Sequence, residues 1–158
     1  MSKLRDLDLS INCIAFVDNG AFIDLVSLKT LLLSENNLNS LSGDIFQGLS
    51  NLTMLDLNEN NIQFIQTSAL HNCLTKVPPD IRSLTFLRFL TMKNNLISEM
   101  TCEDFVNTTQ LTELHLSSNR ILKLEKCVFE SLTKLKLLDL SNNLILTFGD
   151  TFKSGDRA

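Results

Sequence analysis

Tryptophan and tyrosine are both absent from this chain of 158 residues, and its aromatic content is ten phenylalanines. The absence is unusual for a recognition protein, because Trp and Tyr commonly dominate the binding energy of interfaces. No uninterrupted apolar run approaches the roughly 20 residues that cross a bilayer, so we expect no membrane segment in this chain. The opening residues, MSKLRDLDLS, also lack the apolar stretch of a secretory signal.

An excess of positive charge is missing as well. The formal net charge is −4, whereas a protein whose main partner is nucleic acid needs a basic stripe to contact the phosphates. We therefore predict no nucleic-acid partner. The composition, 44% hydrophobic and 20% charged residues, is that of one folded domain and not of a disordered chain.

What the chain does contain is a repeat. The pattern Leu-x-x-Leu-x-Leu-x-x-Asn-x-Leu/Ile, with Met for the third Leu in one copy, begins at six leucines: Leu4, Leu28, Leu52, Leu87, Leu111 and Leu135. Successive copies start 24 residues apart, except that 35 residues separate Leu52 from Leu87. A fixed period of this length is typical of a solenoid, in which each repeat forms one coil and stacks on its neighbours. Positions in each repeat are numbered here from its first leucine.

Alternation within each copy predicts a short strand. Leucines at positions 4 and 6 flank one outward residue, as in Leu7-Asp8-Leu9, so one face of the strand is buried. Position 9 is Asn in every copy: Asn12, Asn36, Asn60, Asn95, Asn119 and Asn143. A buried Asn must satisfy both its carbonyl and its amide. We therefore predict a structural ladder of Asn side chains that bond the turning backbone at one corner of each coil.

The return half of each coil is apolar at two positions. These are Val17, Leu41, Ile65, Met100, Leu124 and Phe148 at position 14, and Phe22, Phe46, Leu70, Phe105 and Phe129 at position 19. We expect the phenylalanines to stack as a spine that fills the wide, convex side of the coil. Truncation of one of them would then cost about 3–5 kcal/mol.

The 35-residue step is about one strand and one turn shorter than two whole repeats. We expect residues 71–86, which contain a partial repeat at 72–86, to form a strandless loop or a short helix on the convex side. Pro78-Pro79 can open such a helix, since Pro is tolerated in a first turn. Six strands would remain in one sheet of a single solenoid over residues 1–152, with a disordered tail at 153–158. The alternative is a break into two short stacks.

The repeat, LxxLxLxxNxLxxLxxxxFxxLxxL, resembles the typical 24-residue subclass of leucine-rich repeat proteins, over nearly the whole chain. That subclass is found in Toll-like receptor ectodomains and other extracellular proteins. Residues 74–81, LTKVPPDI, instead resemble a unit common in intracellular members. The resemblance implies an α/β solenoid (horseshoe), with a parallel β-sheet on the concave face and loops, turns or short helices on the convex face. It implies a protein ligand bound on the concave face.

Two family features are missing from the chain. Extracellular members usually carry cysteine-rich caps at both ends, and neither is present. Terminal repeats need polar caps for solubility, and Leu4, Leu7 and Leu9 would leave an apolar edge. We interpret the sequence as a fragment, or as a spliced or mispredicted gene product, and not as a complete receptor.

The outward strand residues are the candidate ligand-binding residues. They are Asp8, Leu32, Met54, Asp56, Phe89, Thr91, Glu113, His115, Leu137 and Asp139. Packing does not require apolar residues there, so Leu32, Met54, Phe89 and Leu137 indicate either a protein-binding patch or ordinary scattered surface hydrophobes. The recurrent Asp at position 5 favours a ligand with basic groups.

Catalysis and metal binding have little support in the sequence. His115 and Glu113 lie on one face with Ser117, but a flat sheet supplies no pocket. The four cysteines, Cys13, Cys73, Cys102 and Cys127, contain no CxxC spacing, so we predict no zinc site and no cofactor. Cys102 and Cys127 fall at neighbouring positions of adjacent repeats, where a disulfide is feasible, although free thiols are the default expectation.

The sequons at Asn51 and Asn107 permit N-glycosylation, and both fall on the return half of the coil. The favoured hypothesis is a non-enzymatic recognition module of an extracellular or cell-surface receptor or adhesion protein. Its partner would be a protein of microbial or cell-surface origin, and a homodimer is compatible with the same features. The alternatives are an intracellular leucine-rich scaffold or adaptor, and a truncated gene product without independent function.

Overall fold

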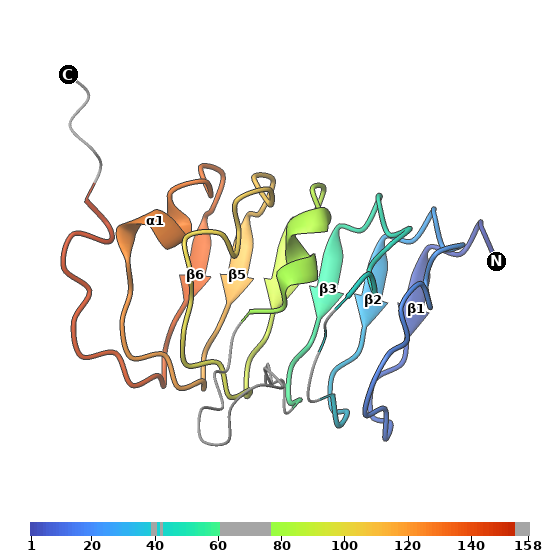
Figure 1. The fold of residues 1–158 in the computed structure, drawn as a ribbon, viewed down its shortest axis with the longest axis horizontal. Helices are drawn as coiled ribbons and strands as arrows, with labels where there is room; N and C mark the ends of the chain where they lie inside the picture. The colour runs from blue at the N-terminus through green and yellow to red at the C-terminus, as the bar shows by residue number, and fades with distance from the viewer. Residues whose placement is uncertain (39–40, 42, 61–76, 154–158) are drawn as a thin grey trace.

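The computed structural model describes residues 1–38, 41, 43–60 and 77–153. Six strands of three residues lie in chain order in one parallel sheet: β1 (Asp6–Asp8), β2 (Thr30–Leu32), β3 (Met54–Asp56), β4 (Phe89–Thr91), β5 (Glu113–His115) and β6 (Leu137–Asp139). The described helices are a 3-10 helix, η1 (Pro79–Ser83), and one α-helical turn, α1 (Lys126–Phe129). Figure 1 shows the coils following one another along the long axis of the molecule. The predicted solenoid with a parallel sheet is thus confirmed.

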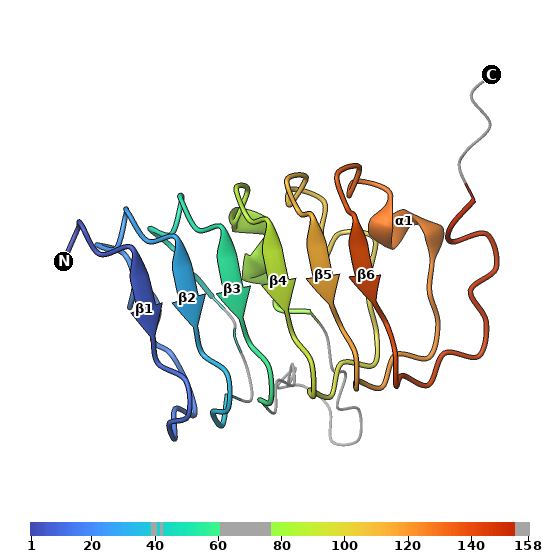
Figure 2. The same ribbon diagram turned by 180° about the vertical axis from the view of Figure 1, so that it is seen from behind.

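Each strand pairs with the next in the same register. Position 4 lies beside position 4 throughout, as Leu31 beside Leu55 and Leu90 beside Leu114, and from β2 to β5 these leucines are fully buried. Side chains at positions 3 and 5 therefore form continuous rows on the opposite side, which we name the sheet face and which is turned toward the viewer in Figure 2. The register makes neighbours of residues that are at least 24 positions apart in the sequence.

Each strand ends in the same tight corner, in which position 8 adopts a left-handed backbone conformation. The φ angles are 56° at Ile11, 52° at Glu35, 52° at Glu59, 53° at Asn94, 56° at Ser118 and 54° at Asn142. This conformation reverses the chain between the strand and the ladder Asn at position 9. It is unfavourable for most L-residues and most of all for a β-branched one, so Ile11 is the poorest fit of the six.

The Asn ladder forms with one repeated geometry. The Asn119 amide donates to the carbonyl of Met92 at 2.9 Å, and its carbonyl accepts from the backbone N–H of Ile97 at 3.0 Å, both in the preceding coil. Asn36, Asn60 and Asn143 repeat this pair of bonds one coil apart. Asn12 differs, because its bonds stay within its own coil and its side chain is exposed. The ladder therefore fastens each coil to the one before it.

The convex side contains the predicted phenylalanine spine only in part. Phe22, Phe46 and Phe105 are buried, as expected. Phe129 is half-buried and packs against the core, whereas Phe148 is 57% exposed, so the assignment of Phe148 to the core is wrong. The ring of Phe152 stacks on that of Phe129 and lies tilted against that of Phe148, which belongs to the last described coil. Ile65 and Leu70 lie outside the described residues.

The irregular step between β3 and β4 leaves the sheet unbroken. Met54 and Phe89 are direct register partners although 35 residues separate them. Within the described part of the step, η1 begins with Pro at its first positions, as the sequence predicts, and buries Ile81 against the core. The two-stack alternative would need β3 and β4 to be unpaired, so it is wrong. Residues 71–76 and 154–158, including His71, Cys73 and most of the expected tail, lie outside the described residues.

Candidate ligand-binding face

The sheet face has a largely apolar centre built by four neighbouring strands, β2 to β5. Met54 and Phe89 are adjacent at position 3 of β3 and β4, and Leu32 lies diagonally from Met54 on β2. The ring of Phe89 also lies 5.2 Å, centroid to centroid, from the ring of His115. All four side chains are half-buried. We name this set, Leu32, Met54, Phe89 and His115, the apolar patch. Leu137 is more exposed, at 41%, and is separated from Phe89 by Glu113.

Thr91 was expected to face a ligand, but the structure buries it, with only 3% of its surface exposed. Its hydroxyl donates to the side-chain carbonyl of Asn58, which also accepts from the backbone N–H of Lys93 at 2.7 Å. Asn58 thereby connects the coils on either side of the irregular step. The assignment of Thr91 to a ligand contact is therefore wrong. Asn58 could have been noticed in the sequence, because most other copies have Ser at its position 7.

Polar contacts hold His115 in place beside the patch. Its Nε2 lies 3.4 Å from a carboxylate oxygen of Glu113, and its Nδ1 lies 3.8 Å from a carboxylate oxygen of Asp139. Only 14% of the His115 side chain is exposed, against 44% for Glu113. Most of the His115 side chain is therefore shielded from solvent, and the Glu113 carboxylate is the more accessible of the two groups.

Asp139 is kept ionised by its surroundings. The Ser141 hydroxyl donates to it at 2.7 Å and the Ser141 backbone N–H at 3.1 Å, and Lys93 lies 3.6 Å away. Chiefly through the Ser141 hydroxyl, and against a smaller effect of burial, the pKa of Asp139 falls to about 2. Ser10 similarly lowers the pKa of Asp8 by bonding it through its backbone N–H and its hydroxyl. Both carboxylates stay negative at any physiological pH.

Acidic side chains gather where the strands end. They are Asp8, Glu35, Asp56, Glu59 and Asp139, at positions 5 and 8. Among the described residues at positions 5, 7 and 8, Lys93 is the one Lys or Arg. The apolar patch is therefore bordered on this side by negative charge, which attracts a partner with basic groups.

The catalytic elements noted in the sequence do not form an active site. Glu113 and His115 are close, but Ser117 is buried and its hydroxyl bonds Asp139, lowering the pKa of that carboxyl. The hydroxyl is thus already engaged by a carboxylate. A nucleophile must be accessible to substrate, so this trio supplies no hydrolytic site.

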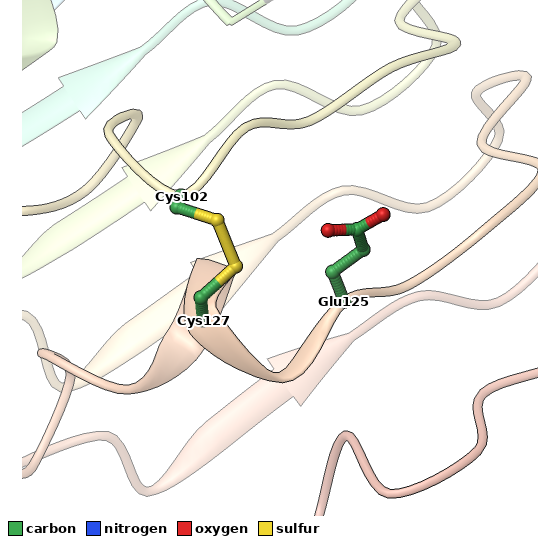
Figure 3. Close-up of side chains that lie close together, drawn as sticks. All are labelled: Cys102, Glu125 and Cys127. Carbon is green, nitrogen blue, oxygen red and sulfur yellow. A yellow bond between two sulfur atoms is a disulfide. The ribbon is translucent and has the colours of Figure 1, made fainter.

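Cys102 and Cys127 are joined by a disulfide between adjacent coils, and their Cα atoms are 4.9 Å apart. The default expectation of free thiols at this pair is therefore wrong. Figure 3 shows the bond with Glu125 beside it, and one ligand atom from each of the three residues falls within 4.8 Å of the others. Since the two sulfurs are bonded to each other, neither offers the thiolate that a metal requires. Cys13 is a free, exposed thiol.

Both sequon asparagines are exposed. Asn107 lies on the return half of its coil, as the sequence predicts. Asn51 lies closer to the sheet than expected, just before β3, and its amide donates to the carbonyl of Val26 at 2.9 Å. It borders a shallow depression shared with Lys3, Arg5, Ser27 and Lys29. Among the described residues, no helix is long and apolar enough to cross a membrane.

The fold and the Asn ladder define a repeat solenoid that presents a side-chain surface on a parallel sheet. The Leucine rich repeat family model matches residues 1–38, 26–73 and 109–154, and the chain belongs to this family. It is 34% identical over 148 residues to human leucine-rich repeat-containing protein 66, covering 92% of this chain and 17% of the relative. It is 35% identical over 173 residues to Toll-like receptor 3 of Bos taurus, covering 91% and 19% respectively.

A solved structure, that of a TLR13–ssRNA13 complex, superposes with a TM-score of 0.68 at 26% identity, covering 90% of this chain and 22% of that one. The chain thus spans about a fifth of the length of these relatives. Leucine-rich repeat domains of this kind are interaction modules, and the relatives include receptors. The family of this chain is therefore established.

Proposed function

We propose that this chain is a non-enzymatic recognition module of an extracellular or cell-surface protein, and that its sheet face binds a protein ligand. The apolar patch carries the proposal. Nothing in the coil requires apolar side chains at positions 3 and 5, since the core is filled from positions 4 and 6. An apolar cluster bordered by charge is the usual composition of a protein-binding surface.

The charges around the patch favour a ligand with basic groups. Five carboxylates line the strand ends, and Glu113 remains exposed between Phe89 and Leu137. Asp8 and Asp139 are held negative by hydrogen bonds from serines. The contact residues we propose are Asp8, Leu32, Met54, Asp56, Phe89, Glu113, His115, Leu137 and Asp139, which omits the buried Thr91.

Two features support an extracellular location over an intracellular scaffold. Disulfides persist in oxidising compartments and are rare in the cytosol, and Cys102–Cys127 joins two coils. Both sequon asparagines are exposed and accessible to glycan transfer. Mass spectrometry of the native protein would decide the location. A glycan at Asn51 or Asn107 supports a secretory route, whereas unmodified sequons together with free Cys102 and Cys127 would favour the intracellular alternative.

The ligand-binding test needs a paired set of variants. The chain, displayed as an Fc fusion, is screened against purified secreted and cell-surface proteins, and each binder is then titrated against Met54→Ser/Phe89→Ser. We expect this double variant to abolish binding. The matched control is Ile23→Ser/Val106→Ser, which removes two exposed apolar side chains from the return half and should bind normally. Equal affinity for both variants would exclude the sheet face as the binding surface.

A further inference from the structure

The edge of the sheet where the strands begin has a composition unlike that of the rest of the chain. This edge consists of position 2 and the two residues that precede each first leucine, eighteen residues in all. They contain six cations and no carboxylate, and the cations are Lys3, Arg5, Lys29, Arg88, Lys134 and Lys136. We name these six residues the cationic edge.

The segregation of charge is strong for an acidic protein. Six of the 14 Lys and Arg residues, but none of the 18 Asp and Glu residues, occupy this edge. The remaining positions of the edge are mostly Ser, Thr, Asn and Gln, which can donate hydrogen bonds to anions. The net charge of −4 therefore conceals a basic stripe, and the overall charge is a poor guide to what this edge binds.

Backbone contacts show that these residues stack from coil to coil. The N–H of Lys29 donates to the carbonyl of Arg5 at 2.7 Å, and the Thr112 hydroxyl donates to the carbonyl of Arg88 at 3.0 Å. Lys134 reaches back to the side chain of Gln110 at 2.6 Å. The edge therefore follows the strand starts in Figure 2 as one line. Neighbouring strands lie about 4.8 Å apart, so six strands extend this line over roughly 24 Å.

The charges of this line are available to a ligand. All six cations are exposed, and the ion pairs found among the described residues involve none of them. The nearest acidic side chains of the strand ends, at position 5, lie three residues beyond position 2, or roughly 10 Å away at about 3.3 Å per residue. That distance exceeds the screening length of about 8 Å at physiological ionic strength. Salt therefore weakens the attraction between the two edges.

We propose that the cationic edge binds a linear sulfated polysaccharide laid across the strand starts. A polyanion with closely spaced charges can contact several of the six cations at once, whereas an isolated anion meets one or two. Single-stranded nucleic acid is the competing polyanion, but its binding grooves combine positive charge with aromatic side chains on which bases stack. Phe86 is the single aromatic residue of the edge, and the chain has no Trp or Tyr. The edge thus offers charge and hydrogen bonds without a stacking platform.

Asn51 lies within this edge, beside Arg5 and Lys29. A glycan on Asn51 would cover the first half of the line and would oppose polysaccharide binding there. The polysaccharide site and a glycan at Asn51 are therefore mutually exclusive on this structure, and occupancy of the sequon would control access. The same glycan leaves the sheet face open, so this inference stands apart from the proposed protein ligand.

The test is a titration of the secreted 158-residue chain, carrying Asn51→Gln, with a heparin-derived decasaccharide. We expect binding at about 0.15 M salt that weakens steeply as salt is raised, and no binding of the desulfated decasaccharide. The variant Lys29→Gln/Arg88→Gln should lower the affinity on the order of tenfold and reduce the slope of log affinity against log salt by about one to two, through the loss of two ionic contacts. The matched control, Arg120→Gln/Lys123→Gln, removes the same charge away from the edge and should bind like the parent.

Three results would overturn the proposal. The first is no measurable binding of the sulfated decasaccharide at physiological salt. The second is an equal loss of affinity in both double variants, which would indicate nonspecific attraction. The third is a single-stranded RNA of matched charge that binds more tightly than the decasaccharide and depends on Lys29 and Arg88, which would make the edge a nucleic-acid surface. Circular dichroism of each variant confirms that the fold is retained.

Discussion

At the scale of single residues, the repeat imposes one conformation on six positions that hold four kinds of side chain. Position 8 is left-handed in every coil, whichever residue occupies it. Asn tolerates this conformation well, whereas Ile is among the residues that it strains most. Ile11 is also 74% exposed, so it gains little from packing. The left-handed corner is thus imposed by the fold of the coil. The residue at position 8 determines only how much conformational free energy that corner costs.

Replacement of Ile11 should therefore stabilise the protein. We expect Ile11→Asn to raise the free energy of unfolding by about 1 kcal/mol, because the left-handed backbone costs an L-residue about 1–2 kcal/mol and Asn less. Urea denaturation followed by circular dichroism measures the change. Ile11→Val keeps the branched side chain and serves as the control. A gain in the Val variant equal to that in the Asn variant would show that backbone strain is not the cause.

A second prediction at this scale concerns Asp139 and pH. Its pKa in the fold is lowered to about 2, mainly by the Ser141 hydroxyl, from the usual value of about 3.9. A carboxyl whose pKa is depressed by folding contributes stability above the unfolded value and loses it as pH falls through the folded value. Stability should therefore decline between about pH 4 and pH 2, and less so in Asp139→Asn. Thermal melts at a series of pH values test this, and parallel declines in both proteins would contradict it.

At the scale of elements, the Asn ladder joins each strand corner to the preceding coil. Asn119 satisfies a carbonyl and an N–H of that coil from a buried position, whereas Asn12 bonds only its own coil and is exposed. The two residues have the same place in the sequence motif and different energetic roles. The difference comes from the contacts with a preceding coil, which Asn119 makes and Asn12 does not make in this structure.

This contrast predicts unequal costs for one substitution. We expect Asn119→Ala to destabilise the fold by roughly 1–3 kcal/mol, the cost of a buried group left unpaired, because it leaves the N–H of Ile97 without its acceptor. The carbonyl of Met92 loses one bond but still accepts from the Asn95 amide at 3.1 Å. Asn12→Ala should cost about 0.5 kcal/mol or less, as expected for an exposed position. Guanidinium denaturation of both variants gives the comparison. Equal losses would mean that the inter-coil bonds contribute little.

At the scale of the whole molecule, stability is the sum of coil interiors and coil–coil interfaces. Cys102–Cys127 joins the coil of β4 to that of β5 and closes a loop of 25 residues. Because β3 pairs with β4, the coils before the irregular step and the coils after it stabilise each other. Each coil is therefore stabilised by its contacts with the neighbouring coils, and not by a single central core.

Removal of the disulfide should then lower global stability measurably. A loop of this size predicts a loss of about 3 kcal/mol from the added chain entropy of the unfolded state. We expect Cys102→Ser/Cys127→Ser to melt at lower temperature, and the parent protein to match it when a thiol reductant is present. Cys13→Ser serves as the control, since that cysteine is free and exposed. A reductant effect that persists in the double Ser variant would rule out the bond as its origin.

The sequence by itself determined the architecture of this protein. The six leucine motifs and the six ladder asparagines predicted the strands, their parallel order and the corner bonds, because a period-two pattern and a 24-residue repeat admit few other ways to bury apolar side chains. It also placed the outward residues at positions 3 and 5, since alternation along a strand determines which face a side chain occupies.

Tertiary structure decided what depends on contacts between coils. The sequence pattern places Thr91 among the outward residues, but its hydroxyl donates a hydrogen bond to the side chain of Asn58 in the neighbouring coil. Phe148 has the pattern of a core residue and is exposed in the last described coil. The pairing of Cys102 with Cys127, and the alignment of six cations along one edge, likewise require the register between repeats. Such features arise from the stacking of neighbours, which no single repeat encodes.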